Sequence, residues 1–370
     1  MALEILESLF ALCEERKASD IHLTAGEPPW MRLQGVLAPL GDDKLSDSEA
    51  ESAAVWLGAT TLPAGTADAA GVRDAVLARL SAKGALDGAC SSKSGARYRF
   101  NLFRENSRIA IAIRRLDDEF RSLASLGLPE RLDGFCDCRD GLVIVTGPTG
   151  SGKSTTLATL IDRVNRTRSG HIITIEDPVE YLHQSRRCLV RQRQVGRDAT
   201  GFNEALVEAL REDPDVILVG EIRELETIRT AITAAETGHL VFTTLHSGDC
   251  AGAVERLVSV FPAAEQEGVR RQLAMVLRGI FAQHLMPTAD GKGRVPACEL
   301  LVATTAVANL VATGRSNQIY SAIETGAAQG MFTMEQSLAG LVTAGRITPQ
   351  AAIAMSRNPD NLSKRLARNP

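Results

Sequence analysis

A run of glycines that ends in lysine and serine is the part of this 370-residue chain in which residue types and spacing most clearly suggest chemistry. Residues 147–154 match the G-x-x-x-x-G-K-[S/T] spacing of a phosphate-binding loop, between an apolar run at 142–145 and a helical pattern at 155–164. Glycines let backbone N–H groups close around phosphate oxygens, Lys153 reaches the terminal phosphates, and the Ser154 hydroxyl ligates Mg²⁺. We therefore predict a site for nucleotide phosphates and Mg²⁺ formed by Gly147, Pro148, Thr149, Gly150, Ser151, Gly152, Lys153, Ser154 and Thr155.

A second apolar run, residues 216–219, ends in Gly220 and Glu221. A nucleoside triphosphatase needs an acid at the carboxyl end of a buried strand, to hold Mg²⁺ or to orient the attacking water. Many phosphate-loop proteins carry Asp where this chain has Gly220, so Glu221 must serve alone. We predict that Glu221 polarises the water and that Mg²⁺ is held mainly by Ser154, phosphate and water.

Acids and histidines follow or flank two further apolar runs. Glu176, Asp177 and Glu180 come directly after the run 172–175, at the strand end where α/β sheets bind ligands. Solvated loop acids are the alternative for these three. His239 and His246 bracket a short buried run that begins at 240, so they could sense the γ-phosphate or transmit its loss. A structural role is the alternative for each histidine.

The elements that must position these residues divide into two kinds along the chain. Residues 1–116 combine helical and alternating patterns, which predicts a small α+β domain. Its expected helices are 3–17, 46–58 and 71–83, its expected strands are 20–23, 30–33, 98–104 and 109–113, and part of the Ala/Gly/Ser-rich stretch 59–95 is interpreted as an insertion.

A linker is expected over 117–129, and the pattern changes after it. Apolar runs at 142–145, 172–175, 216–219 and 240–242 alternate with helical segments, which is typical of a buried, mostly parallel sheet. From 291 to 370 we expect short helices, including 334–343 and 349–355. The expected units are therefore 1–116, 117–129, 130–290 and 291–370.

Composition and charge narrow the functional classes. Hydrophobic residues make up 44% and charged residues 23%, which fits an ordinary globular protein and excludes a disordered chain. The formal net charge of −4 argues against nucleic acid as a partner. The cysteines number seven, which is odd, and five of them are scattered, which argues against a disulfide framework and favours a reducing compartment. No apolar run is long enough to span a bilayer, so we expect a cytoplasmic protein whose membrane role is peripheral.

Together these elements resemble the Walker A, Asp box, Walker B and His box of the secretion ATPase superfamily. Further segments resemble the PilT-type retraction ATPases of type IV pili over nearly the whole chain, and most weakly over 59–95. The segments that carry this resemblance are 18–23, 211–215, 219–221, 225–228, 234–239, 256–262, 320–323 and 330–331.

The resemblance implies an α/β fold with a RecA-like P-loop ATPase core, an N-terminal α+β PAS-like domain and a C-terminal helical tail. It also implies a homohexameric, Mg²⁺-dependent motor that hydrolyses ATP to retract pili in twitching motility. Such a motor binds an inner-membrane platform protein at the cytoplasmic base of the pilus machine, alongside a possible second pilus ATPase. The implied site residues are Glu221 as catalytic acid, Glu180 in the Asp box, His239 and His246 in the His box, and Arg97, Arg99 and Arg114 as arginines that reach nucleotide.

Departures from the family pattern keep two alternatives open. The family's retraction-linked motif A-I-R-N-L-I occurs here at 306–311 with Ala308 in place of Arg. This favours, as one alternative, an accessory nucleotide-gated subunit of a pilus motor with little turnover of its own. The other alternative is a pilus-assembly or type II secretion ATPase. The four-cysteine zinc motif of that branch is missing, since only Cys250 and Cys298 lie in the relevant region.

Overall fold

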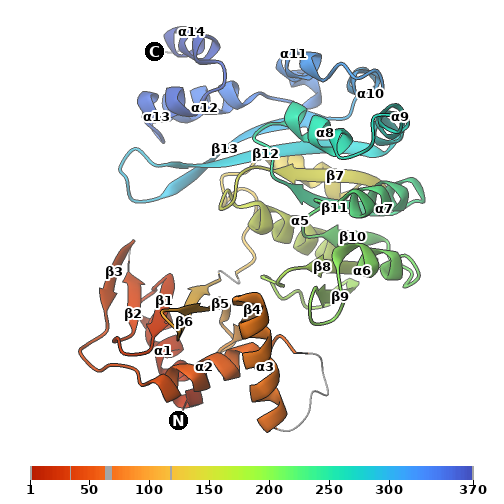
Figure 1. Cartoon of the computed structure of the whole chain (residues 1–370). Coiled ribbons are helices and arrows are strands. Elements are labelled where there is room, and N and C mark those ends of the chain that lie inside the picture. Colours follow the sequence, from red (N-terminus) through yellow and green to blue (C-terminus); the bar gives the residue numbers. More distant parts are fainter. Residues whose placement is uncertain (1, 34, 63–68, 117–118, 369–370) are drawn as a thin grey trace. The chain divides into compact units, whose positions relative to one another are not determined.

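The computed structural model describes residues 2–33, 35–62, 69–116 and 119–368 (Figure 1). They form two compact units. The first unit contains residues up to 119 together with 176–183 and 192–201, and the second contains 120–175, 184–191 and 202–370. Asp117 and Asp118 of the expected linker, and residues 63–68 of the Ala/Gly/Ser-rich stretch, lie outside the described residues.

The first unit contains a six-stranded sheet in the order β3-β2-β1-β6-β5-β4, with every neighbouring pair antiparallel. This confirms the expected α+β architecture. One expectation was incomplete, because the Ala/Gly/Ser-rich stretch supplies β4, which pairs along its whole length with β5. The elements are α1 Ala2–Glu15, β1 Asp20–Thr24, β2 Trp30–Leu33, β3 Val36–Pro39, α2 Asp47–Ala59, α3 Ala69–Lys83, β4 Ala85–Ser91, β5 Arg97–Glu105 and β6 Arg108–Arg115.

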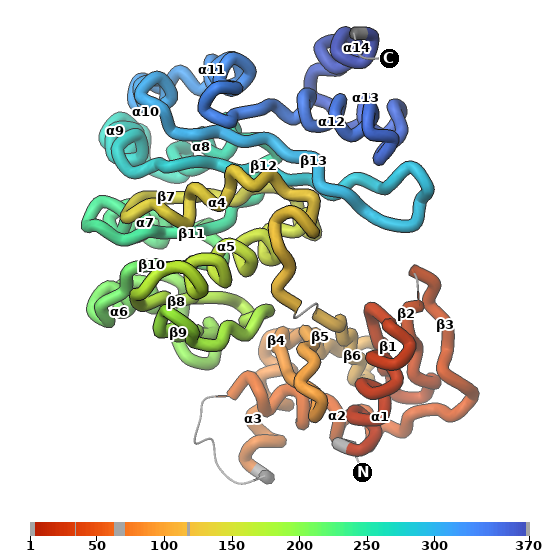
Figure 2. Tube along the Cα trace, turned by 180° about the vertical axis from the view of Figure 1, so that it is seen from behind, coloured from red at the N-terminus to blue at the C-terminus, as the bar shows by residue number. Residues whose placement is uncertain are grey.

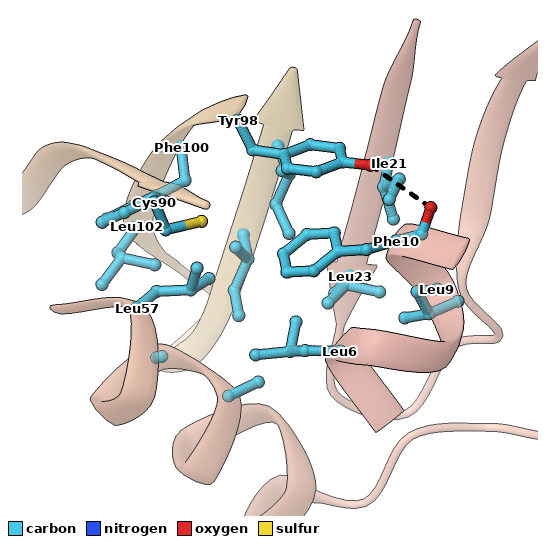
Figure 3. Packing of buried hydrophobic residues seen from close by; sticks show 14 of the residues in the cluster. Leu6, Leu9, Phe10, Ile21, Leu23, Leu57, Cys90, Tyr98, Phe100 and Leu102 are labelled. Atoms are coloured by element: carbon cyan, nitrogen blue, oxygen red, sulfur yellow. Dashed lines mark hydrogen bonds between the residues drawn. The ribbon is translucent and has the colours of Figure 1, made fainter. Parts of the chain in front are cut away.

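Apolar residues from α1, α2 and the sheet form the core of this unit (Figure 3). Phe10 of α1 stacks on Tyr98 of β5, with ring centroids 4.2 Å apart and planes inclined by 22°. The Tyr98 hydroxyl donates to the Phe10 carbonyl at 3.2 Å, so the buried polar atom has a partner. Ser46 caps α2 in a capping box with Glu49, which explains why this helix begins where it does.

A seven-stranded sheet, most of whose residues belong to the second unit, has the order β13-β12-β7-β11-β10-β8-β9. Strands β12, β7, β11, β10 and β8 are mutually parallel, and β13 pairs antiparallel with β12. The strands are β7 Gly141–Thr146, β8 Gly170–Glu176, β9 Cys188–Gln194, β10 Val216–Val219, β11 Leu240–Leu245, β12 Leu277–Pro287 and β13 Arg294–Val302. The mostly parallel sheet predicted from the apolar runs is thus confirmed.

Helices pack on this sheet, and along the chain several of them alternate with its strands (Figures 1 and 2). The α-helices are α4 Asp133–Cys136, α5 Lys153–Thr167, α6 Phe202–Ala209, α7 Leu225–Glu236, α8 Cys250–Ser259, α9 Gln266–Val276, α10 Thr305–Ala312, α11 Ile319–Thr325, α12 Met334–Thr343, α13 Pro349–Met355 and α14 Pro359–Arg368, with 3₁₀ turns at Glu130–Leu132, Ser316–Gln318 and Ala327–Gln329. No described helix has the length and apolar character needed to cross a bilayer.

Two sequence expectations were wrong in this unit. Residues 294–302 form a strand of the main sheet, so the helical tail begins only at α10 and not at 291. Residues 120–129 are not a free linker, because Leu123 and Leu128 are buried in the hydrophobic core of the second unit. In both places apolar side chains find a buried surface, which composition alone did not reveal.

The central strands β7, β10 and β11 are buried at every position. Helices cover both faces of a parallel sheet, which accounts for their continuous apolar runs. Because the strands are parallel, the residues after their carboxyl ends meet at one edge of the sheet. That edge carries the loops after β7, β10 and β11.

Candidate functional site

The phosphate-binding loop connects β7 to α5 through backbone conformations that require glycine. Gly147, Gly150 and Gly152 have φ values of 149°, 77° and 90°, a region that other residues rarely adopt. Gly152 is the N-cap of α5, so the first free N–H groups of that helix face the loop. The loop therefore presents backbone donors and a helix N-terminus, the arrangement that binds phosphate.

Lys153 is held over this loop by its own backbone. Its Nζ donates to the carbonyls of Gly147 and Pro148, each at 2.9 Å. An ammonium has three N–H donors, so one remains for an anion. Burial lowers the pKa of Lys153, while the charge of Glu221 opposes that shift.

Glu221, Arg223 and His246 form a polar cluster at the same edge. The Glu221 carboxylate lies 2.8 Å from Arg223 Nη2 and 3.5 Å from His246 Nε2, and the Arg223 and His246 atoms are 3.4 Å apart. Burial, followed by the charge of Lys153, lowers the pKa of His246 from 6.5, so the imidazole is neutral at pH 7. A neutral imidazole next to a carboxylate can accept or donate a proton in a hydrogen-bonded water chain.

Threonine hydroxyls fix the strand ends that carry this cluster. Thr146 Oγ1 accepts from the Ser247 N–H at 2.9 Å and donates to the Ser247 carbonyl at 2.8 Å, which joins the end of β7 to the loop after β11. Thr244 Oγ1 donates to the Gly220 carbonyl at 2.6 Å, which joins β11 to the loop after β10. The three loops are therefore held at fixed positions relative to one another.

The residues present fit a magnesium–nucleotide complex. Among the described residues, no group of three or more His, Cys, Asp or Glu side chains could hold a metal ion unaided. Ser154 lies exposed in the first turn of α5, where its hydroxyl is available as the predicted Mg²⁺ ligand. Mg²⁺ is typically bound by one or two protein oxygens together with substrate phosphates and water, which matches this donor set.

His239 is not brought into the cluster. It precedes β11, and its carbonyl accepts from the N–H of Gly141 at the start of β7, whereas His246 lies beyond the end of β11. A strand of this length spans roughly 20 Å, so the two histidines lie at opposite edges of the sheet. His239 Nδ1 instead lies 2.9 Å from the Ala234 carbonyl in the last turn of α7. His239 therefore contacts the end of α7, and its predicted role in sensing the γ-phosphate has no support in this geometry.

The predicted arginines and Glu180 lie in the first unit, each with a partner there. Arg99 Nη1 is 3.7 Å from Glu180 Oε1, and Arg114 Nε is 2.8 Å from Asp20 Oδ1. These two arginines are largely exposed, so their nucleotide contacts stay a prediction.

Arg97 differs from the other two arginines because it is buried. It donates to the carbonyl of Val179 at 2.8 Å and to Ser91 Oγ at 3.1 Å, and burial lowers its pKa. Arg97 therefore holds the backbone next to Glu180. The predicted contact between Arg97 and nucleotide has no support in this arrangement.

Sequence reasoning missed functional candidates that contact the predicted ones. Arg223 follows Glu221 by two residues in the same loop, and this spacing could have identified it. Gln283 and Thr156 hydrogen-bond to each other across the phosphate-binding loop. The signal for Gln283 was a polar residue after the apolar run 280–282.

A parallel sheet with a phosphate-binding loop after one strand and a carboxylate after a nearby strand defines a P-loop nucleoside triphosphatase. Residues 104–352 match the family described as "Type II/IV secretion system protein", and the chain belongs to this family.

Similar proteins agree with this family. The chain is 41% identical to the type IV pilus retraction ATPase PilT of Pseudomonas aeruginosa, over 96% of this chain and 99% of that protein. It is 48% identical to a twitching motility protein of Neisseria gonorrhoeae, over 72% of each. A crystal structure of the pilus retraction motor PilT with bound ADP superimposes with a TM-score of 0.84, at 40% identity, covering 97% of this chain and 98% of that one. The similarity to PilT-type ATPases and the predicted fold class are thereby confirmed.

Proposed function

We propose that this chain is an ATP-hydrolysing motor that works as a homohexamer and retracts or disassembles type IV pili. The observation that carries the proposal is the grouping of Lys153, Glu221 and His246 at the carboxyl ends of neighbouring strands. The similarity to a retraction ATPase along nearly the full length of both chains supports type IV pili as the structures on which the motor acts.

The side chains suggest how hydrolysis proceeds. Loop N–H groups and the free N–H of Lys153 hold the phosphates, and they stabilise the charge on them as the γ-phosphoryl group transfers to water. Glu221 orients that water, with neutral His246 in reach to relay its proton. Mg²⁺, bound to Ser154 and the phosphates, would supply further charge neutralisation. Arg223 keeps the Glu221 carboxylate in place and lowers its cost of burial.

The first unit is proposed to contribute side chains that recognise nucleotide. Glu180, paired with Arg99, and the exposed Arg114 carry charges suited to recognise a nucleotide or its Mg²⁺. Planar guanidinium groups are suited to bidentate contact with phosphate. The proposed domain assignment is an N-terminal α+β domain followed by an ATPase domain with a helical C-terminal part.

The proposed location and protein partners of the motor rest on similarity alone. The motor would act at the cytoplasmic base of the pilus machine, peripheral to the inner membrane, against a platform protein and beside a possible second pilus ATPase. Nucleic acid is not a proposed partner, given the net charge of −4.

Deleting the gene and counting surface pili while scoring twitching tests the direction of force. Hyperpiliated cells that do not twitch support retraction. Cells that lose pili support an assembly ATPase and contradict the proposal.

A second candidate, an accessory subunit with little turnover, is favoured by Ala308 on α10. Purified protein with negligible hydrolysis that is restored by a partner ATPase would support this candidate. Steady phosphate release by the purified chain alone would exclude it.

A further inference from the structure

Gln283 lies in β12 directly beneath the phosphate-binding loop. Its neighbour Ala282 pairs with Thr146 at the end of β7, and Gln283 is only 3% exposed. It follows three fully buried apolar residues of the same strand. A buried amide costs stability unless both of its ends are hydrogen-bonded. The groups that hydrogen-bond to Gln283 therefore indicate its role.

Both ends of the Gln283 amide are used at the loop. One end lies 2.7 Å from the Ser151 carbonyl and the other 2.7 Å from Thr156 Oγ1. A carbonyl can only accept, so the amide NH₂ must face Ser151 and the amide oxygen must accept from Thr156. Thr156, on the first turn of α5, therefore fixes which way the amide points.

The backbone of the loop also closes on this residue. A Cβ at Gly147 would lie 2.2 Å from the Gln283 carbonyl oxygen, and one at Gly152 would lie 2.7 Å from Gln283 Nε2. By contrast, a Cβ at Gly150 would meet nothing within 4 Å. Two of the motif glycines are thus required for close approach to Gln283 in addition to their φ values.

The bond to Ser151 has a consequence for the next residue. In a trans peptide the C=O of one residue and the N–H of the next point in opposite directions. Holding the Ser151 carbonyl on Gln283 therefore turns the Gly152 N–H away from β12. That N–H belongs to the set of loop donors that bind phosphate.

We propose that Gln283 is a positioning residue for nucleotide binding: through the Ser151 carbonyl it aims the Gly152 N–H at the phosphates, with Thr156 fixing its orientation. This inference rests on the proposed function. It concerns phosphate recognition, however, so it can be tested by binding without any hydrolysis.

The test compares ADP with adenosine on the purified full-length chain, each displacing a fluorescent ADP analogue in the presence of Mg²⁺. Gln283→Leu keeps the size and removes both hydrogen bonds, leaving the Ser151 carbonyl unpaired. A lost buried partner corresponds to a roughly 5- to 150-fold effect, so ADP affinity should fall within that range. Adenosine affinity should change by less than about twofold, because adenosine has no phosphate for the loop to bind.

Two further variants make the test specific. Thr156→Val removes only the group that orients the amide, and it should weaken ADP in the same direction but less. Its effect combined with Gln283→Leu should be less than additive, since the two act through one contact. Tyr320→Phe removes the hydrogen bond to buried Glu335 elsewhere in the same unit, and it should lower stability without changing the ratio of ADP to adenosine affinity.

The outcomes separate the two proposals. A folded Gln283→Leu variant with unchanged ADP affinity, or an equal loss for ADP and adenosine, overturns the positioning role. If Gln283→Leu does not fold, an unchanged ADP affinity in Thr156→Val overturns the role as well. Wild-type protein that binds ADP but hydrolyses no ATP would contradict the motor function and leave the positioning result valid.

Discussion

Replacing Glu221 with Gln tests the proposed catalytic cluster most directly. The change keeps the size of the side chain and its ability to accept from Arg223, 2.8 Å away, but removes the negative charge. An amide is a much weaker base than a carboxylate, so it cannot draw a proton from the attacking water. Loss of a general base typically costs 10²–10⁴ in rate.

We take the lower limit of that range as the smallest loss of turnover expected for Glu221→Gln, because a second proton acceptor lies nearby. His246 lies 3.5 Å from Glu221 and is neutral at pH 7, so it can still accept a proton from a nearby water. We therefore expect turnover to fall at least ~100-fold, equivalent to roughly 2.7 kcal/mol of transition-state stabilisation. ATP binding should persist, because Lys153 and the loop N–H groups are unchanged and a charge that repels phosphate is lost.

Phosphate release and ATP binding should be measured on the same preparation. Glu224→Gln is a matched control, since Glu224 is an exposed acid in the same loop whose side chain forms no cap on α7. That control should keep turnover within about twofold of the wild type. Near-normal turnover in Glu221→Gln would remove Glu221 from the catalytic role.

Three further predictions concern stability and coupling. Burial lowers the pKa of His183 from 6.5 to about 4, so below pH 6.5 the unfolded chain binds a proton that the folded chain excludes. Stability should fall by up to roughly 3 kcal/mol as pH drops from 6.5 to 4, and urea midpoints of His183→Gln should vary less over that range. Phe10→Ala, in the core of the first unit, should lower the free energy of unfolding measured in urea by about 3–5 kcal/mol. The control Val36→Ala, at a side chain that is 68% exposed, should lower it by under about 0.5 kcal/mol. Equal losses for the two variants would contradict the packing in Figure 3. Ala308→Arg, at a half-buried position of α10, should leave ATP turnover within about twofold of the wild type and change twitching speed. Unchanged twitching would show that this position does not couple ATP hydrolysis to retraction.

Sequence patterns located the parts of the site that follow buried strands. The runs at 142–145 and 216–219 are continuous because their strands are covered on both faces, and the motifs that follow them could be placed at strand ends without the structure. Strands β12 and β13 were not predicted. They contain Gly279, Gln283 and Pro296, which interrupt the apolar pattern, and their pairing with each other depends on contacts between distant residues.

His239 shows how strand direction limits reasoning from sequence. It and His246 appear equivalent along the chain, one on each side of the same strand. A parallel sheet makes them unequal, because only the residue after the carboxyl end lies near the phosphate-binding loop. The parallel sheet was itself predicted, so the direction of β11 could have excluded His239 from the cluster in advance.

The position of Gln283 can be predicted once the register of β12 on β7 is known. Ala282 of β12 pairs with Thr146, the last residue of β7, so the next residue of β12 must lie beside Gly147 at the start of the loop. A polar residue at that position is enclosed by buried strands and can satisfy its hydrogen bonds only with the loop or with the first turn of α5. It therefore has to hold the loop, although it follows no phosphate-binding motif of its own. Groups that contact a ligand are visible as local spacing, whereas groups that hold them in place emerge only from the pairing of strands distant in sequence.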